Sequence, residues 1–273
     1  MMSVRTIALM GLGVLGFVAL PVRAEVLTKT AQQGNVKAEL SYEQVSTSGL
    51  PQTKNVRLRI QRSGQTVFDQ APKISEYDRP IVSFGRNDDD RGFVVRDLNG
   101  DKDPEVIADM YTGGAHCCEY SLIYQYDADQ KQYVESQAYW GNLGYELRDL
   151  DQDGKTEFYS ADDRFAYAFT SYAASAFPIQ IWRFDKGEMV DVTRQYPKLI
   201  YSDAYKLWQG YQRVRLYQEA EVKGILAAYL ADKYLLGQQE DGWKRLRAAY
   251  QESDREKFFN DLRVFLKKTE YEK

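Results

Sequence analysis

Histidine and cysteine are nearly absent from this chain of 273 residues, which contains one His and two Cys. A Ser-His-Asp or Cys-His catalytic centre would therefore have to use His116, the only histidine. A zinc site built from several His and Cys ligands is nearly excluded for the same reason. The chain also has neither a P-loop pattern nor a G-x-G-x-x-G motif after a strand. We therefore expect no nucleotide-dependent enzyme.

Long apolar runs are also missing, apart from one at the start. Residues 7–20 carry no charge and follow Arg5, and the small residues Val22 and Ala24 come after them. This order is typical of a cleaved secretory signal, whereas a membrane-spanning helix needs about 20 apolar residues. We expect a signal peptide over residues 1–24, export to the periplasm or secretion, and no membrane span in the mature chain.

Basic residues are outnumbered by acidic ones. Removal of residues 1–24 leaves 34 Lys and Arg against 40 Asp and Glu, a net charge of −6. The deficit lies in residues 25–200, which carry 20 basic and 28 acidic residues, whereas residues 201–273 carry 14 and 12. A nucleic-acid partner would need a basic face, and so would docking on anionic lipid, so we expect neither.

The spacing of apolar residues divides the chain in two. Residues 36–42 and 56–60 alternate apolar and polar side chains, as half-buried strands do. Turn residues separate them from further short strand-like runs. Toward the C-terminus, apolar residues instead repeat every three or four positions, which is the helical period. The sequence predicts a mainly β protein, with a β-rich domain over 25–198 and an α-helical domain over 199–273.

Two local signals indicate ends of the expected helices. Gly237 follows the apolar pair Leu235-Leu236, where a helix C-terminus is expected. The pattern from Ser253 to Glu256 is a capping box, in which the Ser hydroxyl and the Glu carboxylate bind free backbone N–H groups. With the apolar stripes, these signals predict three or four helices.

One internal repeat is present. Residues 92–105 match residues 144–157 without gaps at an offset of 52, and residues 123–127 resemble 181–185 further along. A fixed period of about 50 residues predicts stacked β units, each with the strand content of one four-stranded propeller blade. We therefore expect partial propeller-like, antiparallel β units. They would span residues 92–139 and 144–193.

Each copy of the repeat contains an acidic loop with an oxygen-bearing side chain at every second position. Alternating oxygens on a tight turn can converge on one point, and Ca²⁺ takes about six to eight oxygen ligands. An EF-hand would need a Glu at position 12, where the copies have Ala108 and Ser160. The oxygen-bearing residues are Asp97, Asn99, Asp101, Asp103 and Glu105 in the first loop, and Asp149, Asp151, Asp153 and Glu157 in the second.

These loops resemble the calcium loops of FG-GAP repeats, also called VCBS or integrin-α-like propeller repeats. The resemblance implies side-chain ligands at positions 1, 3, 5 and 9 and a backbone carbonyl at position 7, here that of Asp103 or Lys155. It departs from the pattern at Lys102, where Gly is usual and where the second loop has Gly154. Because a non-Gly residue with φ > 0 is disfavoured, we expect the second loop to bind calcium more tightly. The implied side-chain ligands are Asp97, Asn99, Asp101 and Glu105, and Asp149, Asp151, Asp153 and Glu157.

The segment His116-Cys117-Cys118 follows two glycines and an alanine in an expected loop. Two cysteines of an exported protein are usually oxidised, but adjacent Cα atoms lie about 3.8 Å apart, below the usual disulfide range. A bond between them would be strained and would fix a kink. Three interpretations stay open: a kink or vicinal disulfide, a ligand-contact loop, and a redox or soft-metal site.

Aromatic and acidic residues give weaker signals, and no catalytic residue is assigned. Adjacent carboxylates such as Asp162 and Asp163 rarely act on opposite sides of a sugar bond. We expect the segment Asp162-Asp163-Arg164 to be a salt-bridged turn or a turn that supports the neighbouring acidic loop. An aromatic face for sugar stacking and ordinary core packing both stay open for five residues. These are Trp140, Tyr145, Tyr167, Tyr172 and Trp182.

By its resemblance, the chain is expected to be a calcium-binding protein with a non-enzymatic binding or scaffold role in the cell envelope. Its partner would be a protein or a glycan that the sequence does not identify. The alternative is an enzyme, either a carbohydrate-active one that uses the acidic loops or a thiol-redox one that uses Cys117 and Cys118.

Overall fold

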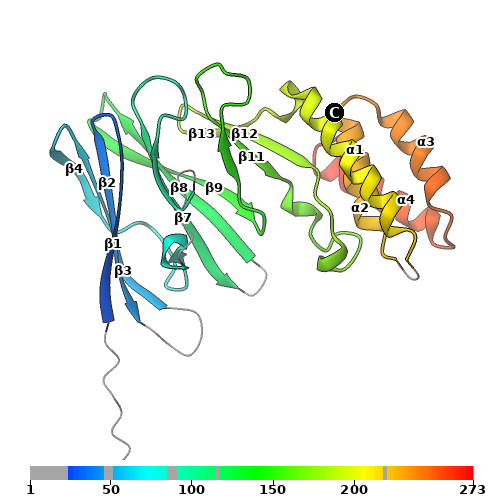
Figure 1. Cartoon of the computed structure of the whole chain (residues 1–273), viewed down its shortest axis with the longest axis horizontal. Helices are drawn as coiled ribbons and strands as arrows, with labels where there is room; N and C mark the ends of the chain where they lie inside the picture. Colours follow the sequence, from blue (N-terminus) through cyan, green and yellow to red (C-terminus); the bar gives the residue numbers. More distant parts are fainter. Residues whose placement is uncertain (1–23, 46–51, 85–90, 115–116, 218–219, 273) are drawn as a thin grey trace, which may run out of the picture.

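The described residues form a mainly antiparallel β structure followed by a C-terminal helical part, as the sequence predicts (Figure 1). The expected signal peptide falls outside them, apart from Ala24. The computed structural model describes residues 24–45, 52–84, 91–114, 117–217 and 220–272.

The first sheet is a meander in which neighbouring strands follow each other in the chain. Its second and third strands contain the two alternating segments of the sequence. Val36, Ala38 and Leu40 are fully buried, and the residues between them are partly exposed. The strands are β1 (Ala24–Gln33), β2 (Val36–Val45), β3 (Gln52–Arg62) and β4 (Gln65–Gln70).

The second and third sheets contain the two copies of the repeat. In the second sheet the order is β5-β7-β8-β9 with β6 paired to β7, and in the third it is β10-β11-β12-β13. The second sheet consists of β5 (Arg79–Pro80), β6 (Phe93–Arg96), β7 (Glu105–Gly114), β8 (Cys117–Asp127) and β9 (Gln132–Gly141). The third consists of β10 (Glu146–Arg148), β11 (Glu157–Ala161), β12 (Ile179–Asp185) and β13 (Glu188–Asp191). Short 3₁₀ helices lie at Ile81–Phe84, Asp163–Phe165, Tyr172–Ala174 and Thr193–Gln195.

The two similar segments of the sequence have equivalent strand pairings. Arg96 of β6 lies opposite Glu105 of β7, and Arg148 of β10 lies opposite Glu157 of β11. In each sheet the acidic loop connects this first pair of strands. One apolar core lies between the first and second sheets, another between the second and third, and a smaller one joins the third sheet to the first helix.

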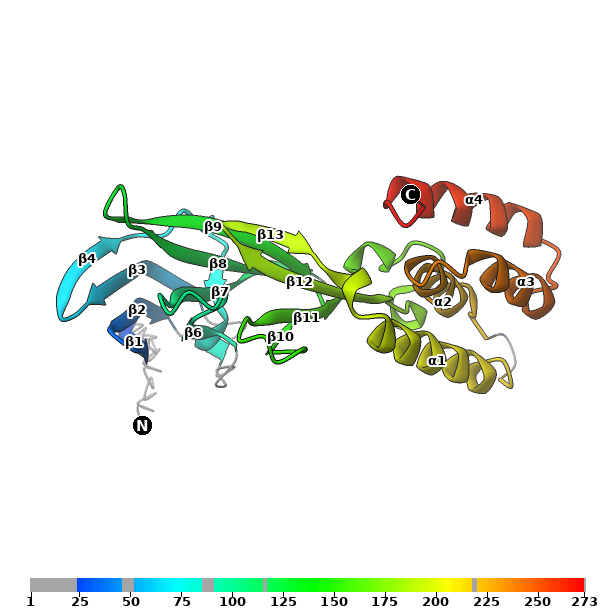
Figure 2. The same ribbon diagram turned by 90° about the horizontal axis from the view of Figure 1, so that it is seen from above.

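Four helices complete the described part of the chain. They are α1 (Pro197–Val214), α2 (Lys223–Leu235), α3 (Gln239–Ala249) and α4 (Arg255–Lys268). Every residue of α2 from Leu226 to Lys233 is buried, so this helix is the centre of the helical part. The molecule is elongated, with the sheets at one end and the helices at the other (Figure 2). Among the described residues, no helix has the length and apolar character that a membrane crossing requires.

One predicted helix end is right and one predicted cap is wrong. Gly237 has φ +67°, and its N–H donates to the carbonyl oxygen of Tyr234, so it ends α2 as expected. The capping box does not form, because α4 begins at Arg255 with Asp254 as its cap residue and without a side-chain cap bond. The carboxylate of Asp254 is instead bound by Lys223 and by the hydroxyl of Tyr250.

Candidate functional site

The two acidic loops lie side by side, although they are about fifty residues apart in sequence. The Thr156 N–H donates to the carbonyl oxygen of Leu98 at 2.9 Å. A Cβ on Gly100 would lie 3.3 Å from the carbonyl oxygen of Gly154, so the two turns are almost in contact. The fold therefore gathers both predicted ligand sets at one edge of the second and third sheets.

Both loops have the same backbone conformation, with two left-handed residues each. In the first loop these are Gly100 (φ +80°) and Lys102 (φ +69°), and in the second they are Gln152 (φ +62°) and Gly154 (φ +84°). The expected left-handed strain at Lys102 is present, but it does not distinguish the two loops, because each places one glycine and one non-glycine residue in this region. Tighter binding by the second loop stays a prediction. Lys102 is also held by a 2.9 Å bond from its N–H to Asp97 Oδ2.

Each loop folds over a buried glutamate. Glu105 is 1% exposed and Glu157 is 0% exposed. Their Oε2 atoms accept the N–H groups of Leu98 and Leu150, each at 3.0 Å. Position 9 of each loop is thus fixed in the same way, with the carboxylate under the turn.

The two glutamates differ in their counter-charge. Arg183 of β12 donates to Glu157 Oε1 through Nη2 at 2.6 Å and Nε at 2.9 Å. Gln125 of β8 takes the corresponding place in the first copy, and its neutral amide lies 3.3 Å from Glu105 Oε1. Burial raises the pKa of Glu105 to about 8, and the charges of Asp101 and Asp97 add to the effect.

The loop aspartates also differ in their neighbours. Asp149, Asp151 and Asp153 are exposed, and one carboxylate oxygen from each lies within 4.8 Å of the other two. Arg183 Nη2 lies 3.6 Å from Asp151 and 3.7 Å from Asp153. In the first loop, Asp103 is held by Arg62 of β3 through bonds of 2.5 and 2.9 Å. The predicted carbonyl ligands of Asp103 and Lys155 stay a prediction.

The vicinal cysteines begin β8. His116 lies outside the described residues, and of Cys117 only the backbone is described. Cys118 is disulfide-bonded, and the sequence contains one other cysteine, Cys117. The Cys118 N–H donates to Thr112 Oγ1 at 2.8 Å, which fixes the start of the strand.

The five aromatic residues considered for sugar stacking do not form one face. Trp140 and Tyr145 are buried in the core between the second and third sheets. There, Tyr145 and Ser121 both donate to Asp109, and Trp140 Nε1 donates to Ser121. Tyr167 and Tyr172 pair with each other at 5.3 Å. Trp182 is partly buried and lines a cleft.

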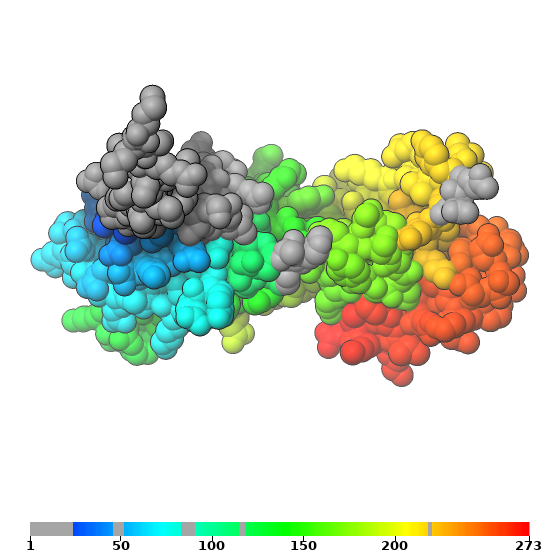
Figure 3. Space-filling view, turned by 90° about the horizontal axis from the view of Figure 1, so that it is seen from below, coloured from blue at the N-terminus to red at the C-terminus, as the bar shows by residue number. Residues whose placement is uncertain are grey.

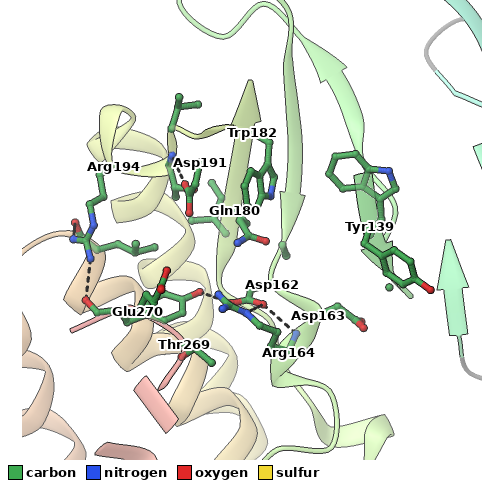
Figure 4. Close-up of a pocket in the computed structure, with 18 of the residues that line it drawn as sticks. Tyr139, Asp162, Asp163, Arg164, Gln180, Trp182, Asp191, Arg194, Thr269 and Glu270 are labelled. Carbon is green, nitrogen blue, oxygen red and sulfur yellow. Dashed lines mark hydrogen bonds and ion pairs between the residues drawn. The ribbon is translucent and has the colours of Figure 1, made fainter. Parts of the chain in front are cut away.

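This cleft has a volume of about 890 Å³ and lies where the second sheet, the third sheet and the C-terminal segment meet. Figure 4 shows Tyr139 on one side, Arg194 and Glu270 on the other, and Gln180 and Trp182 between them. Cys118 contributes to the same lining. The sequence did not predict this site, because its residues come from segments as far apart as Cys118 and Tyr271.

Hydrogen bonds hold the walls of the cleft together. Asp162 is 2% exposed and accepts Arg164 Nη2 at 2.7 Å, which confirms the expected salt-bridged turn. The hydroxyl of Tyr271 donates to the same carboxylate at 2.9 Å. Arg194 donates to the carbonyl oxygens of Tyr234, Leu235 and Tyr271 at 2.9–3.0 Å.

Comparison with known proteins gives a family match for the helical part of the chain. A family model described as the sll0997 C-terminal domain matches residues 200–270. The probable thylakoid lumen protein sll0997 of Synechocystis is 29% identical over 235 residues, which is 84% of this chain and 65% of the relative. The uncharacterized protein y4bJ of Sinorhizobium fredii is 28% identical over 208 residues, 74% of this chain and 31% of the relative. The chain thus spans less than two thirds of either relative. No solved structure matches the chain.

Proposed function

We propose that this chain is an exported protein that binds calcium at its two acidic loops and has a non-enzymatic binding or scaffold role. The observation that carries the proposal is the gathering of the Asp149, Asp151 and Asp153 carboxylates on one exposed loop. Three like charges this close repel each other, and an oxygen-only ligand set suits a hard cation such as Ca²⁺. The first loop repeats the same backbone with Asp97, Asn99, Asp101 and Glu105.

The contacts around the loops support a structural role for the cation. The N–H of Asp97 donates to Gln33 Oε1 at 2.7 Å, which ties the first loop to the turn between β1 and β2. The hydroxyl of Tyr196, directly before α1, donates to Asp151 at 3.3 Å. Calcium in the two loops would therefore stiffen a line of contacts that runs from the first sheet to the helical part.

Two further features support the proposal. Each sheet contains a four-stranded antiparallel meander, and apolar cores lie between neighbouring sheets, which is the arrangement expected of propeller-like units. Export fits both the apolar start of the chain and its similarity to a probable thylakoid lumen protein.

The direct test is the thermal melt of residues 25–273 against calcium, with a chelator control. Extracellular modules bind calcium at roughly 10⁻⁴–10⁻³ M, so two sites at about tenfold excess would add roughly 3 kcal/mol. For a chain of this size, that is a rise in Tm of roughly 5–10 °C. Asp97→Ala and Asp149→Ala should each remove part of the rise. An unchanged Tm with calcium in millimolar excess would refute calcium binding.

A matched variant tests the difference between the loops. Arg183→Gln gives the second loop the residue that the first copy has at Gln125, and it leaves Glu157 buried without a counter-charge. We expect a Tm in chelator well below that of the wild type, because breaking a buried ion pair costs about 3–5 kcal/mol. We also expect calcium to raise the Tm of this variant by more than it raises the Tm of the wild type. An equal calcium response in the two proteins would contradict a cation beside Glu157.

A further inference from the structure

The cleft between the sheets and the helical part has the size and position of a ligand site. Its volume of about 890 Å³ is within the range of small-molecule sites, about 300–1,000 Å³, and such sites occur preferentially where parts of a protein meet. The molecule narrows between its two ends, where the third sheet meets the helical part (Figure 3). The bonds of Asp162 and Arg194 to the C-terminal segment hold the walls in place, so the cleft is preformed.

Aromatic rings line two sides of the cleft. Tyr139 is 63% exposed, and its ring stacks on Tyr120 at 5.8 Å with an interplanar angle of 10°. Tyr120 is itself fixed, because its hydroxyl donates to Asp78 at 2.7 Å. The exposed ring of Tyr139 therefore already has a fixed orientation, so ligand binding would cost little side-chain conformational entropy. Trp182 adds a second, partly buried ring from β12.

The polar groups of the lining favour a hydroxyl-rich ligand. Asp163, Asp191 and Glu270 supply carboxylate oxygens that accept hydrogen bonds, and the Gln180 amide both donates and accepts. The cleft does not favour an anion, because the guanidinium group of Arg164 is bound to Asp162 and that of Arg194 is bound to backbone carbonyls.

We propose that this cleft binds a neutral saccharide, with Tyr139 and Trp182 against the C–H faces of sugar rings and Gln180, Asp163 and Glu270 bound to hydroxyl groups. The proposal gives the binding role proposed above a ligand class, and it rests on that role but not on calcium. The cleft is separate from the acidic loops, which share none of its lining residues.

The test is isothermal titration calorimetry of residues 25–273 in calcium buffer. The probes are linear tetrasaccharides of α-1,4-glucose, β-1,4-glucose, β-1,4-mannose and β-1,4-N-acetylglucosamine, with spermidine as a cationic probe. We expect at least one saccharide to bind, and we expect Trp182→Ala and Tyr139→Ala each to weaken its Kd by about tenfold or more. Tyr205→Ala is the matched control, because Tyr205 is 58% exposed on α1 outside the cleft. It should leave the Kd unchanged.

Three results would overturn the proposal. They are the absence of binding by every saccharide at about 10 mM, binding of spermidine alone, and a Kd that is the same in the wild type and both cleft variants. If Trp182→Ala does not fold, Gln180→Ala takes its place beside the surface variant Tyr139→Ala. The thermal melt against calcium is interpreted independently of the saccharide titration. A calcium shift without saccharide binding overturns only the cleft, and saccharide binding without a calcium shift overturns only the calcium loops.

Discussion

Replacement of Asp232 by Asn should stabilise the helical part at neutral pH. Asp232 lies in α2 with 0% exposure, and its carboxyl group faces that of Asp203, to which a protonated Asp232 can donate a hydrogen bond. Burial raises the pKa of Asp232 well above its usual range, and the charge of Asp203 on α1 raises it further. Burial likewise raises the pKa of Asp203, whose partial counter-charge is Lys206. The hydroxyl groups of Tyr159 and Tyr271 also interact electrostatically with Asp232.

The sign of the pH effect follows from the raised pKa. An unfolded Asp titrates near pH 3.9, and the folded chain retains this proton to higher pH. The free energy of unfolding therefore falls as pH rises from about 4 toward the folded pKa, by about 1.4 kcal/mol per pH unit. Asn does not titrate, so Asp232→Asn should be more stable than the wild type by about 1–3 kcal/mol at pH 7–8. That corresponds to a Tm increase of roughly 2–10 °C.

The measurement is the Tm of wild type and variant at pH 4, 5.5, 7 and 8.5 in chelator. The two proteins should melt together near pH 4 and diverge as pH rises. Asp261→Asn is the control, because Asp261 is exposed on α4, where its carboxylate pairs with Lys257. Asp261→Asn should leave the difference in Tm between pH 4 and pH 8.5 the same as in the wild type. A variant with a lower Tm than the wild type at pH 8.5, or with the same pH slope, would refute the reasoning.

Two further substitutions test the loops and the joint between the two parts. Lys102→Gly should raise the free energy of unfolding by about 0.5–1 kcal/mol in a urea titration, because relief of left-handed strain exceeds the entropy that Gly loses. A lower urea midpoint would contradict this. Arg194→Ala should lower the stability of the helical part by about 2–3 kcal/mol, because three backbone carbonyls lose a charged donor. Amide exchange near Tyr234 and Tyr271 should then speed up, and unchanged protection there would show that Arg194 does not hold this joint.

Local patterns predicted the features that depend on neighbouring residues. The repeat was visible because turn chemistry acts within a few residues: Asp97 accepts the N–H groups of Gly100 and Lys102, and Asp149 accepts that of Gly154. The end of α2 at Gly237 is equally local. The strain at Lys102 does not distinguish the loops, because the second loop carries its own left-handed non-glycine residue two positions earlier, at Gln152.

Long-range packing decided what the sequence did not predict. The capping box failed because α4 begins at Arg255, so Asp254 and not Ser253 is its cap residue, and the Asp254 carboxylate binds Lys223 and Tyr250 instead of the helix. The cleft depends on the approach of Tyr271 to Asp162, 109 positions away. The sequence aligns Arg183 with Gln125 of the other copy, but the pairing of Arg183 with Glu157 depends on the register of β11 and β12.

The two acidic loops have the same backbone conformation but different neighbours, so a bound cation would stabilise a different part of the molecule in each. The first loop faces the first sheet, where Arg62 neutralises Asp103 and leaves Glu105 beside a neutral amide. The second faces the helical part, where Arg183 already neutralises Glu157 and Tyr196 binds Asp151. In the proposed calcium-bound protein, loss of the first site would therefore loosen the first sheet, and loss of the second would loosen the joint between the third sheet and α1.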